Sequence, residues 1–308
     1  MADWSLIAVR LALYVVLSAM FGLAAFSLYG LTMRERGDAL TLRPWLIASA
    51  CLGLILSIAW LILMATSMAG TSLWPIDQEA LGALLTGSAI GTAWKVRMVA
   101  LVVATACAGA SPNRTLPLIL VTASGAVGLG SLAWTGHGAM DEGSIGWAHL
   151  VADIFHLLAS GTWVGALVGL LLLVSRPVVR VDASHLRLTH RALHGFGSIG
   201  TIVVGTIVIS GLVNGWVLVG LGNITTLTSN LYGQLFVLKL VLFAAILGLA
   251  SLNRFRLTPA FEQSIAAENH RGALGALRTS LLVETGCVVG ILGLVAWLGT
   301  LSPSASAM

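Results

Sequence analysis

The stretch WAHLVADIFHLLASGTWVGALVGLLLLV, residues 147–174, joins a long apolar run to three ionisable side chains near its start. A transmembrane helix needs about 20 predominantly apolar residues, because the hydrocarbon core of a bilayer is about 30 Å thick. His149, Asp153 and His156 therefore lie within the expected span or at its edge. Ionisable groups are costly there and usually have a function, so this segment predicts a membrane protein and the position of its functional site.

The rest of the chain is equally apolar, because 57% of its 308 residues are hydrophobic and 9% are charged. A chain of this composition cannot bury its apolar surface in a water-soluble core. Seven further stretches are long enough to cross a bilayer, at about residues 6–31, 45–68, 94–110, 116–136, 197–221, 232–252 and 278–301. We therefore predict an all-α, polytopic integral membrane protein whose residues 1–308 form a single transmembrane domain, an eight-helix bundle. It lies in a lipid bilayer, and no nucleic acid partner is expected.

Basic residues are unevenly distributed among the connections between spans. Those after the first, third, fifth and seventh spans carry Arg34, Arg36, Arg43, Arg114, Arg176, Arg180, Arg187, Arg191, Arg254, Arg256, Arg271 and Arg278. The other connections contain no Lys or Arg before Lys95, and two of them carry the acidic residues Asp77, Glu79, Asp141 and Glu142, which would concentrate cations. The positive-inside rule places the Arg-bearing connections in the cytoplasm and both termini on the outer side. Residues 76–93 are expected to form an interfacial helix on that outer side.

The three ionisable residues of the opening segment share one helix face. At about 100° per residue, His149, Asp153 and His156 fall within an arc of roughly 60°. At about 1.5 Å per residue, however, the two histidines are roughly 10 Å apart along the axis. A compact metal site therefore needs either His149 with Asp153 or Asp153 with His156, together with groups from other helices. His137, in the short glycine-flanked loop before this helix, is the expected addition and favours an entry site or a two-step relay.

Thioether groups are secondary candidates for metal binding. Met64 and Met68 are spaced i, i+4 at the end of the second span, and Met140 lies close to His137 in the sequence. Imidazole with thioether suits copper, whereas imidazole with carboxylate suits a wider range of divalent ions. Packing against lipid or the protein core remains the alternative explanation for the methionine pair.

Other polar residues occur inside or near the expected spans, namely Lys95, Arg97, Asn214, Lys239 and Glu284. The long basic side chains either reach toward lipid headgroups or face a polar cavity. Glu284 is either a proton site or cation relay, or a partner of a basic residue such as Arg278.

Several stretches resemble the bacterial copper-resistance membrane protein D family, of the CopD and PcoD type. They are Leu85–Leu101 (LTGSAIGTAWKVRMVAL), His149–Leu173, Ser210–Val219 (SGLVNGWVLV) and Tyr232–Pro259, in which Asn253-Arg254-Phe255 is the most specific step. The resemblance is densest over residues 132–301. It implies an eight-helix protein of the bacterial inner membrane that is not an enzyme and moves copper from periplasm to cytoplasm. It also implies a separate periplasmic copper-binding partner of the CopC type.

Two alternative functions remain open. In the first, the protein is a haem-binding membrane redox protein with histidine axial ligands, and Lys95, Arg97 and Lys239 pair with the haem propionates. In the second, it is an accessory factor in copper resistance that conducts no ions itself.

Overall fold

The computed structural model describes residues 3–38, 40–70, 76–110, 114–136, 143–176, 182–220, 227–267 and 271–302. Among these, 8 helical segments are long and apolar enough to cross a membrane. They are α1 (Trp4–Gly30), α3 (Leu42–Ala69), α5 (Ala89–Ala110), α6 (Thr115–Gly130) with the 3-10 turn η1 (Ser131–Thr135), α7 (Gly143–Val174), α8 (Ala183–Val219), α9 (Leu231–Leu252) and α11 (Arg271–Leu298). The π-helical turn η5 (Asn253–Leu257) joins α9 to α10 (Thr258–Ala266). The predicted all-α fold and the predicted number of spans are confirmed for this part of the chain.

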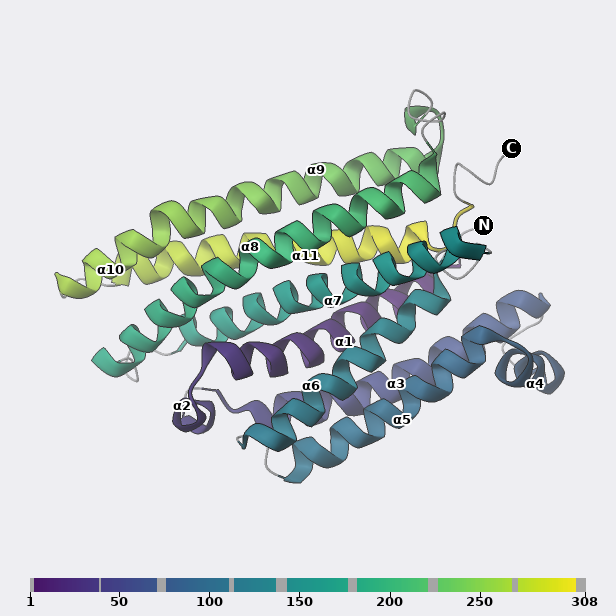
Figure 1. Cartoon of the computed structure of the whole chain (residues 1–308), viewed down its shortest axis with the longest axis horizontal. Helices are drawn as coiled ribbons and strands as arrows, with labels where there is room; N and C mark the ends of the chain where they lie inside the picture. Colours follow the sequence, from purple (N-terminus) through teal and green to yellow (C-terminus); the bar gives the residue numbers. More distant parts are fainter. Residues whose placement is uncertain are drawn as a thin grey trace.

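Helices α1 and α7 form the middle of the bundle (Figure 1). Helix α1 packs against α3, α6, α7 and α11, and α7 packs against α8 and α11. In Figure 1, α3, α5 and α6 lie on one side of this central pair, and α8, α9 and α11 lie on the other. The helix that carries the three ionisable residues is therefore surrounded by protein on both sides.

The start of α1 and the end of α11 lie at the same end of the bundle, which we call the terminal end (Figure 1). Arg10 Nη1 donates a hydrogen bond of 2.8 Å to the Gly299 carbonyl, and the Trp4 and Trp297 rings lie 5.4 Å apart. Helix α4 (Gln78–Gly87), which the sequence predicted within residues 76–93, lies at this end as well. The connections rich in arginine lie at the opposite end, which we call the basic end.

The central pair is held together by glycines. A Cβ atom placed on Gly165 of α7 would lie 1.8 Å from the carbonyl carbon of Gly22 on α1. A Cβ atom placed on Gly22 would lie 2.0 Å from the Gly161 carbonyl oxygen. Membrane helices use small residues in this way, because close backbone approach supplies the van der Waals contact that replaces the hydrophobic effect. This contact therefore decides how α7 is positioned in the bundle.

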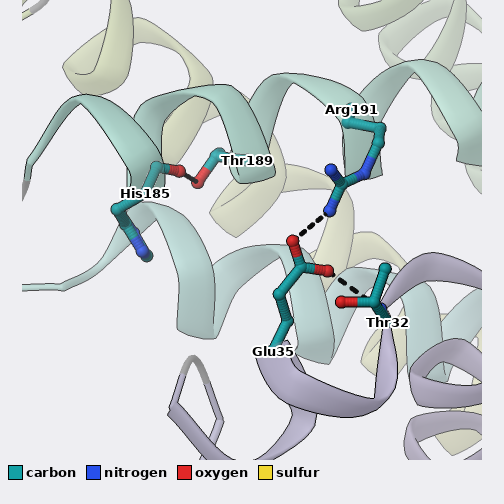
Figure 2. A network of polar contacts seen from close by, with 5 residues as sticks. All are labelled: Thr32, Glu35, His185, Thr189 and Arg191. Atoms are coloured by element: carbon teal, nitrogen blue, oxygen red, sulfur yellow. Dashed lines mark hydrogen bonds and ion pairs between the residues drawn. The ribbon is translucent and has the colours of Figure 1, made fainter.

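At the basic end, the short helix α2 (Met33–Asp38) is tied to α8 (Figure 2). Glu35 accepts hydrogen bonds from the Arg191 guanidinium and from the Thr32 backbone amide. Burial raises the pKa of Glu35, but the hydrogen bonds from Arg191 and Thr32 outweigh burial and hold the pKa below its ordinary value. Nearer the start of α8, the Thr189 hydroxyl donates a hydrogen bond of 2.9 Å to the His185 carbonyl oxygen.

The glycine contact predicts a large effect of one methyl group. We expect Gly165→Ala to lower the free energy of unfolding by about 1–3 kcal/mol, because the new methyl group forces two helix backbones apart. Unfolding of the purified protein in mixed micelles measures this effect. Gly205→Ala on α8 is the matched control, because nothing lies within 4 Å of a Cβ atom placed there. Equal stability of the two variants would show that the α1–α7 contact is less tight than described.

The Glu35–Arg191 contact predicts a pH dependence. Because folding lowers the pKa of Glu35, the contact adds stability above the unfolded pKa of a glutamate, about 4.3, and loses it as the pH falls further. Both groups are partly exposed, so the contribution is at most about 1 kcal/mol. Thermal unfolding should separate wild type from Glu35→Gln at pH 7 and bring them together at low pH. Arg191→Gln should behave in the same way, whereas Arg187→Gln, one turn earlier, should not.

Candidate functional site

Two pairs of polar side chains join α7 to α8 within the bundle. Asn214 Nδ2 donates a hydrogen bond of 2.9 Å to Asp153 Oδ1, and His156 Nδ1 lies 3.0 Å from Ser210 Oγ. The helices run in opposite directions, so the i, i+3 spacing on α7 meets the i, i+4 spacing on α8. These pairs form a short polar ladder, in which each ionisable residue of α7 has a neutral partner on α8.

The hydrogen bonds of Ser210 define the protonation of His156. The single hydroxyl proton of Ser210 is directed to the Thr206 carbonyl oxygen, at 2.6 Å. This arrangement favours the tautomer in which His156 Nδ1 donates to Ser210 Oγ and Nε2 keeps a lone pair. A metal-binding histidine has this arrangement, with one ring nitrogen hydrogen-bonded and the other available for the ion.

Charged groups gather around Asp153 on the terminal side of the ladder. Asp153 lies near His149 on its own helix and near Lys239 on α9. His149 is 1% exposed. The chain before His137 also passes here, because a Cβ atom placed on Gly136 would lie 3.7 Å from Asp153 Oδ2. Asp153 is therefore the centre of a buried group of titratable side chains drawn from at least two helices.

A pocket of about 500 Å³ lies beside the ladder, between α7, α8, α9 and α11. His156, Ser160 and Trp163 line it on the α7 side, and Lys239 lines it on the α9 side. Most of the remaining wall is aliphatic or aromatic. The free nitrogen of His156 and the ammonium group of Lys239 are thus polar groups in a mainly apolar cavity.

A second polar group lies nearer the basic end. Trp163 Nε1 donates a hydrogen bond of 2.7 Å to Glu284 Oε1, and Asn253 Nδ2 donates one of 2.9 Å to Glu284 Oε2. These three residues, together with Arg254, line a pocket of about 250 Å³. Trp163 lines both pockets and therefore separates them.

The structure thus brings together five of the residues that the sequence singled out, namely Asp153, His156, Asn214, Lys239 and Glu284, along one path through the bundle. His149 adjoins its terminal end. Glu284 is 2% exposed, whereas Arg278, its predicted alternative partner, is exposed and makes no ion pair with it among the described residues. That alternative is therefore not observed.

Other predicted residues lie elsewhere or outside the described ranges. Lys95 is exposed on α5, and Arg97 is fully buried with its guanidinium carbon 5.4 Å from the centre of the Trp60 ring. Met64 is half-buried, and Met68 is 65% exposed. His137 and Met140 lie outside the described residues. Within the described ranges, no three His, Cys, Asp or Glu side chains converge to hold one metal ion.

Sequence reasoning missed the partners that orient the ionisable groups. Ser210 lies four residues before Asn214 on the same helix, and this polar spacing in an apolar span was the available signal. Trp163 and Asn253 approach Glu284 from two other helical segments. No local pattern indicates that contact.

The fold and the site together define a polytopic helical membrane protein with buried ionisable and polar side chains between its helices. Comparison with known families identifies the group within this class. Residues 1–147 match the N-terminal domain of copper resistance protein D-like proteins, and residues 190–298 match copper resistance protein D. The chain is 44% identical to copper resistance protein D of Pseudomonas syringae pv. tomato, over 100% of this chain and 99% of that protein.

The chain therefore belongs to the copper resistance protein D family, as the resemblance indicated. A second relative is the copper transport protein CutJ of Bacillus subtilis (strain 168), which is 30% identical over 39% of this chain and 21% of that protein. No solved structure matches the chain.

The Asp153–Asn214 contact predicts a stability effect. We expect Asn214→Leu to lower the free energy of unfolding by about 1–3 kcal/mol, because it leaves a buried carboxyl group without its donor. Thr206→Ala is the control on the same helix, because its hydroxyl group bonds only the Ile202 carbonyl in its own helix. That variant should stay within about 0.5 kcal/mol of wild type. Equal losses in the two variants would contradict a structural role for the ladder.

Proposed function

We propose that this protein carries copper ions across the bacterial inner membrane, from the periplasm to the cytoplasm. The observation that carries this proposal is the orientation of His156. Its Nδ1 atom is hydrogen-bonded to Ser210, which leaves the Nε2 lone pair available, and its side chain lines the pocket between four helices. Imidazole is a good ligand for copper. Membership of the copper resistance protein D family supports copper as the ion.

The distribution of charges supports an orientation of the bundle in the membrane. The described arginines of the connections lie at the basic end, which we place in the cytoplasm by the positive-inside rule. The terminal end then faces the periplasm, where Asp3, Asp77 and Glu79 provide acidic groups. An acidic surface raises the local concentration of cations before they enter.

The route begins at the charged group around Asp153. His149, Asp153 and His137 would capture the ion near the outer membrane edge, and His156 would receive it in the larger pocket. This is a two-step relay, because His149 and His156 are too far apart along α7 to share one ion. Lys239 supplies positive charge near Asp153 before the ion arrives, and the arriving cation takes the place of the Lys239 charge.

Delivery of the ion requires a donor outside the bundle. We propose a separate periplasmic copper-binding protein of the CopC type, which would release copper to the terminal end. The copper ion is the cargo in this scheme. The protein binds and moves it without a catalytic step, so we do not propose an enzyme.

Copper uptake into sealed vesicles that contain only the purified protein tests the proposal. We expect His156→Ala to lower the uptake rate by at least about tenfold, and Ser210→Ala to lower it in the same direction because the imidazole loses its orientation. His194→Ala, which removes an exposed histidine near the basic end of α8, is the matched control and should leave uptake unchanged.

Three other outcomes would redirect the assignment. Unchanged uptake in His156→Ala would reject the route through the larger pocket. Absence of uptake with wild type alone would favour an accessory role. A Soret absorption band in the purified protein that disappears in His156→Ala would favour the haem-binding alternative.

A further inference from the structure

Glu284 differs from the other buried acid of the path in the groups that surround it. Both of its carboxylate oxygens accept hydrogen bonds, and both donors, the Trp163 indole and the Asn253 amide, are neutral. Asp153, in contrast, interacts with Lys239 and His149. Among the described residues, no Lys, Arg or His forms an ion pair with Glu284. Its negative charge therefore has no resident counter-charge in this part of the chain.

A buried carboxylate without a counter-charge is costly, and such a group normally gains stability by taking up a proton. A cation that arrives in the adjoining pocket would supply the missing positive charge instead. The surroundings of Glu284 thus favour either of two states, the protonated acid or the carboxylate with a cation beside it.

Asn253 can serve both states. Its Nδ2 group donates to Glu284, while its Oδ1 atom is buried without a hydrogen-bond partner. Rotation of the amide by half a turn exchanges these two atoms, which are distinguished only by their hydrogen bonds. The rotated amide would accept a hydrogen bond from the protonated carboxyl group. Because Oδ1 has no other hydrogen bond, this rotation would bring an acceptor to the proton of Glu284 without breaking a bond of Oδ1.

The position of Glu284 connects this chemistry to the route. Its partner Trp163 separates the larger pocket, which contains His156, from the smaller pocket, which Glu284 lines. The smaller pocket extends to Arg254 of η5 and Thr258 of α10, near the basic end. A proton released by Glu284 thus enters a pocket that leads away from the copper ligands.

We propose that Glu284 is a proton-binding site on the transport route, where a proton and the transported cation compete for one carboxylate. This inference rests on the proposed copper transport. When the cation reaches Trp163, the O–H bond of Glu284 breaks and the proton leaves through the smaller pocket. When the cation has passed, Glu284 takes up a proton again, so its charge is compensated at each stage.

Other titratable or charged groups occur on the elements that pack against α11. They are Arg10, Tyr14 and Tyr29 on α1, His149, Asp153 and His156 on α7, Tyr232 and Lys239 on α9, Arg254 and Arg256 on η5, Glu262 on α10, and Arg271, Arg278 and Cys287 on α11 itself. Helix α8, which lines the same pockets, adds His185, Arg187, His190, Arg191 and His194. Of all these, Arg254 lines the pocket of Glu284. It is exposed, its Nη1 atom donates a hydrogen bond to the Thr201 hydroxyl, and among the described residues it forms no ion pair with Glu284.

Infrared difference spectroscopy of the full chain in vesicles tests proton binding without copper. Raising the pH should remove the carbonyl band of a protonated carboxylic acid from the wild-type spectrum. Glu284→Gln should lack this band, and Glu262→Gln, which alters an exposed glutamate on α10, should retain it. A band that persists in Glu284→Gln would overturn the proposal. If that variant does not fold, Trp163→Phe should shift the band by removing one donor, and an unshifted band would overturn the proposal.

Copper uptake as a function of pH supplies the second test. Because one proton competes with the cation for the Glu284 carboxylate, we expect wild-type uptake to rise by about tenfold for each unit of increasing pH through the titration. Glu284→Gln should reduce this dependence to less than about twofold for each pH unit. A wild type that shows the infrared band but carries no copper would contradict the proposed transport while supporting the proton site. A wild type that carries copper with the same pH profile as Glu284→Gln would overturn the proton site.

Discussion

The close contact of α1 and α7 at Gly22 and Gly165 is the constraint on which the rest of the structure depends. Lipid is as apolar as a leucine side chain, so membrane helices associate through backbone proximity and complementary shape. This contact holds α7 in the middle of the bundle, with α8 and α11 packed against it. The ionisable residues of α7 consequently face neighbouring helices, where polar groups meet them, and a change of register here would misplace the hydrogen bonds that α7 makes to α8 and α11.

Charge compensation explains the arrangement along the path. Ionisable groups within a membrane are tolerated when they find partners or line a cavity. Asp153 has a basic residue and a histidine near it, His156 has a hydroxyl partner, and Glu284 has two neutral donors. The three groups are therefore stabilised in different ways. In the proposed transport, a cation would meet first Asp153, which has Lys239 nearby, and later Glu284, whose hydrogen-bond donors are neutral.

Much of this architecture was predictable from local properties. The helical spans follow from the length of the apolar runs, and the shared face of His149, Asp153 and His156 follows from helical geometry. The candidate polar residues Asn214, Lys239 and Glu284 were visible as exceptions within apolar segments. The partners of His156 and Glu284 were not predictable, because Ser210 is 54 residues from His156, and Trp163 and Asn253 are 121 and 31 residues from Glu284 along the chain. Such contacts depend on the relative height of helices, which hydropathy does not encode.

By itself, the sequence determined that the chain is a helical membrane protein, that its basic residues gather in alternate connections, and that one helix carries a face of copper-compatible ligands. These properties depend on composition and on the fixed rise and rotation of an α-helix. Only the tertiary structure decided that His156 presents a free nitrogen in the ladder beside the larger pocket, that Trp163 divides two pockets, and that Glu284 is buried away from Arg278. The physical reason is that the packing of backbones at glycines sets the register between helices, and that register decides which polar groups meet.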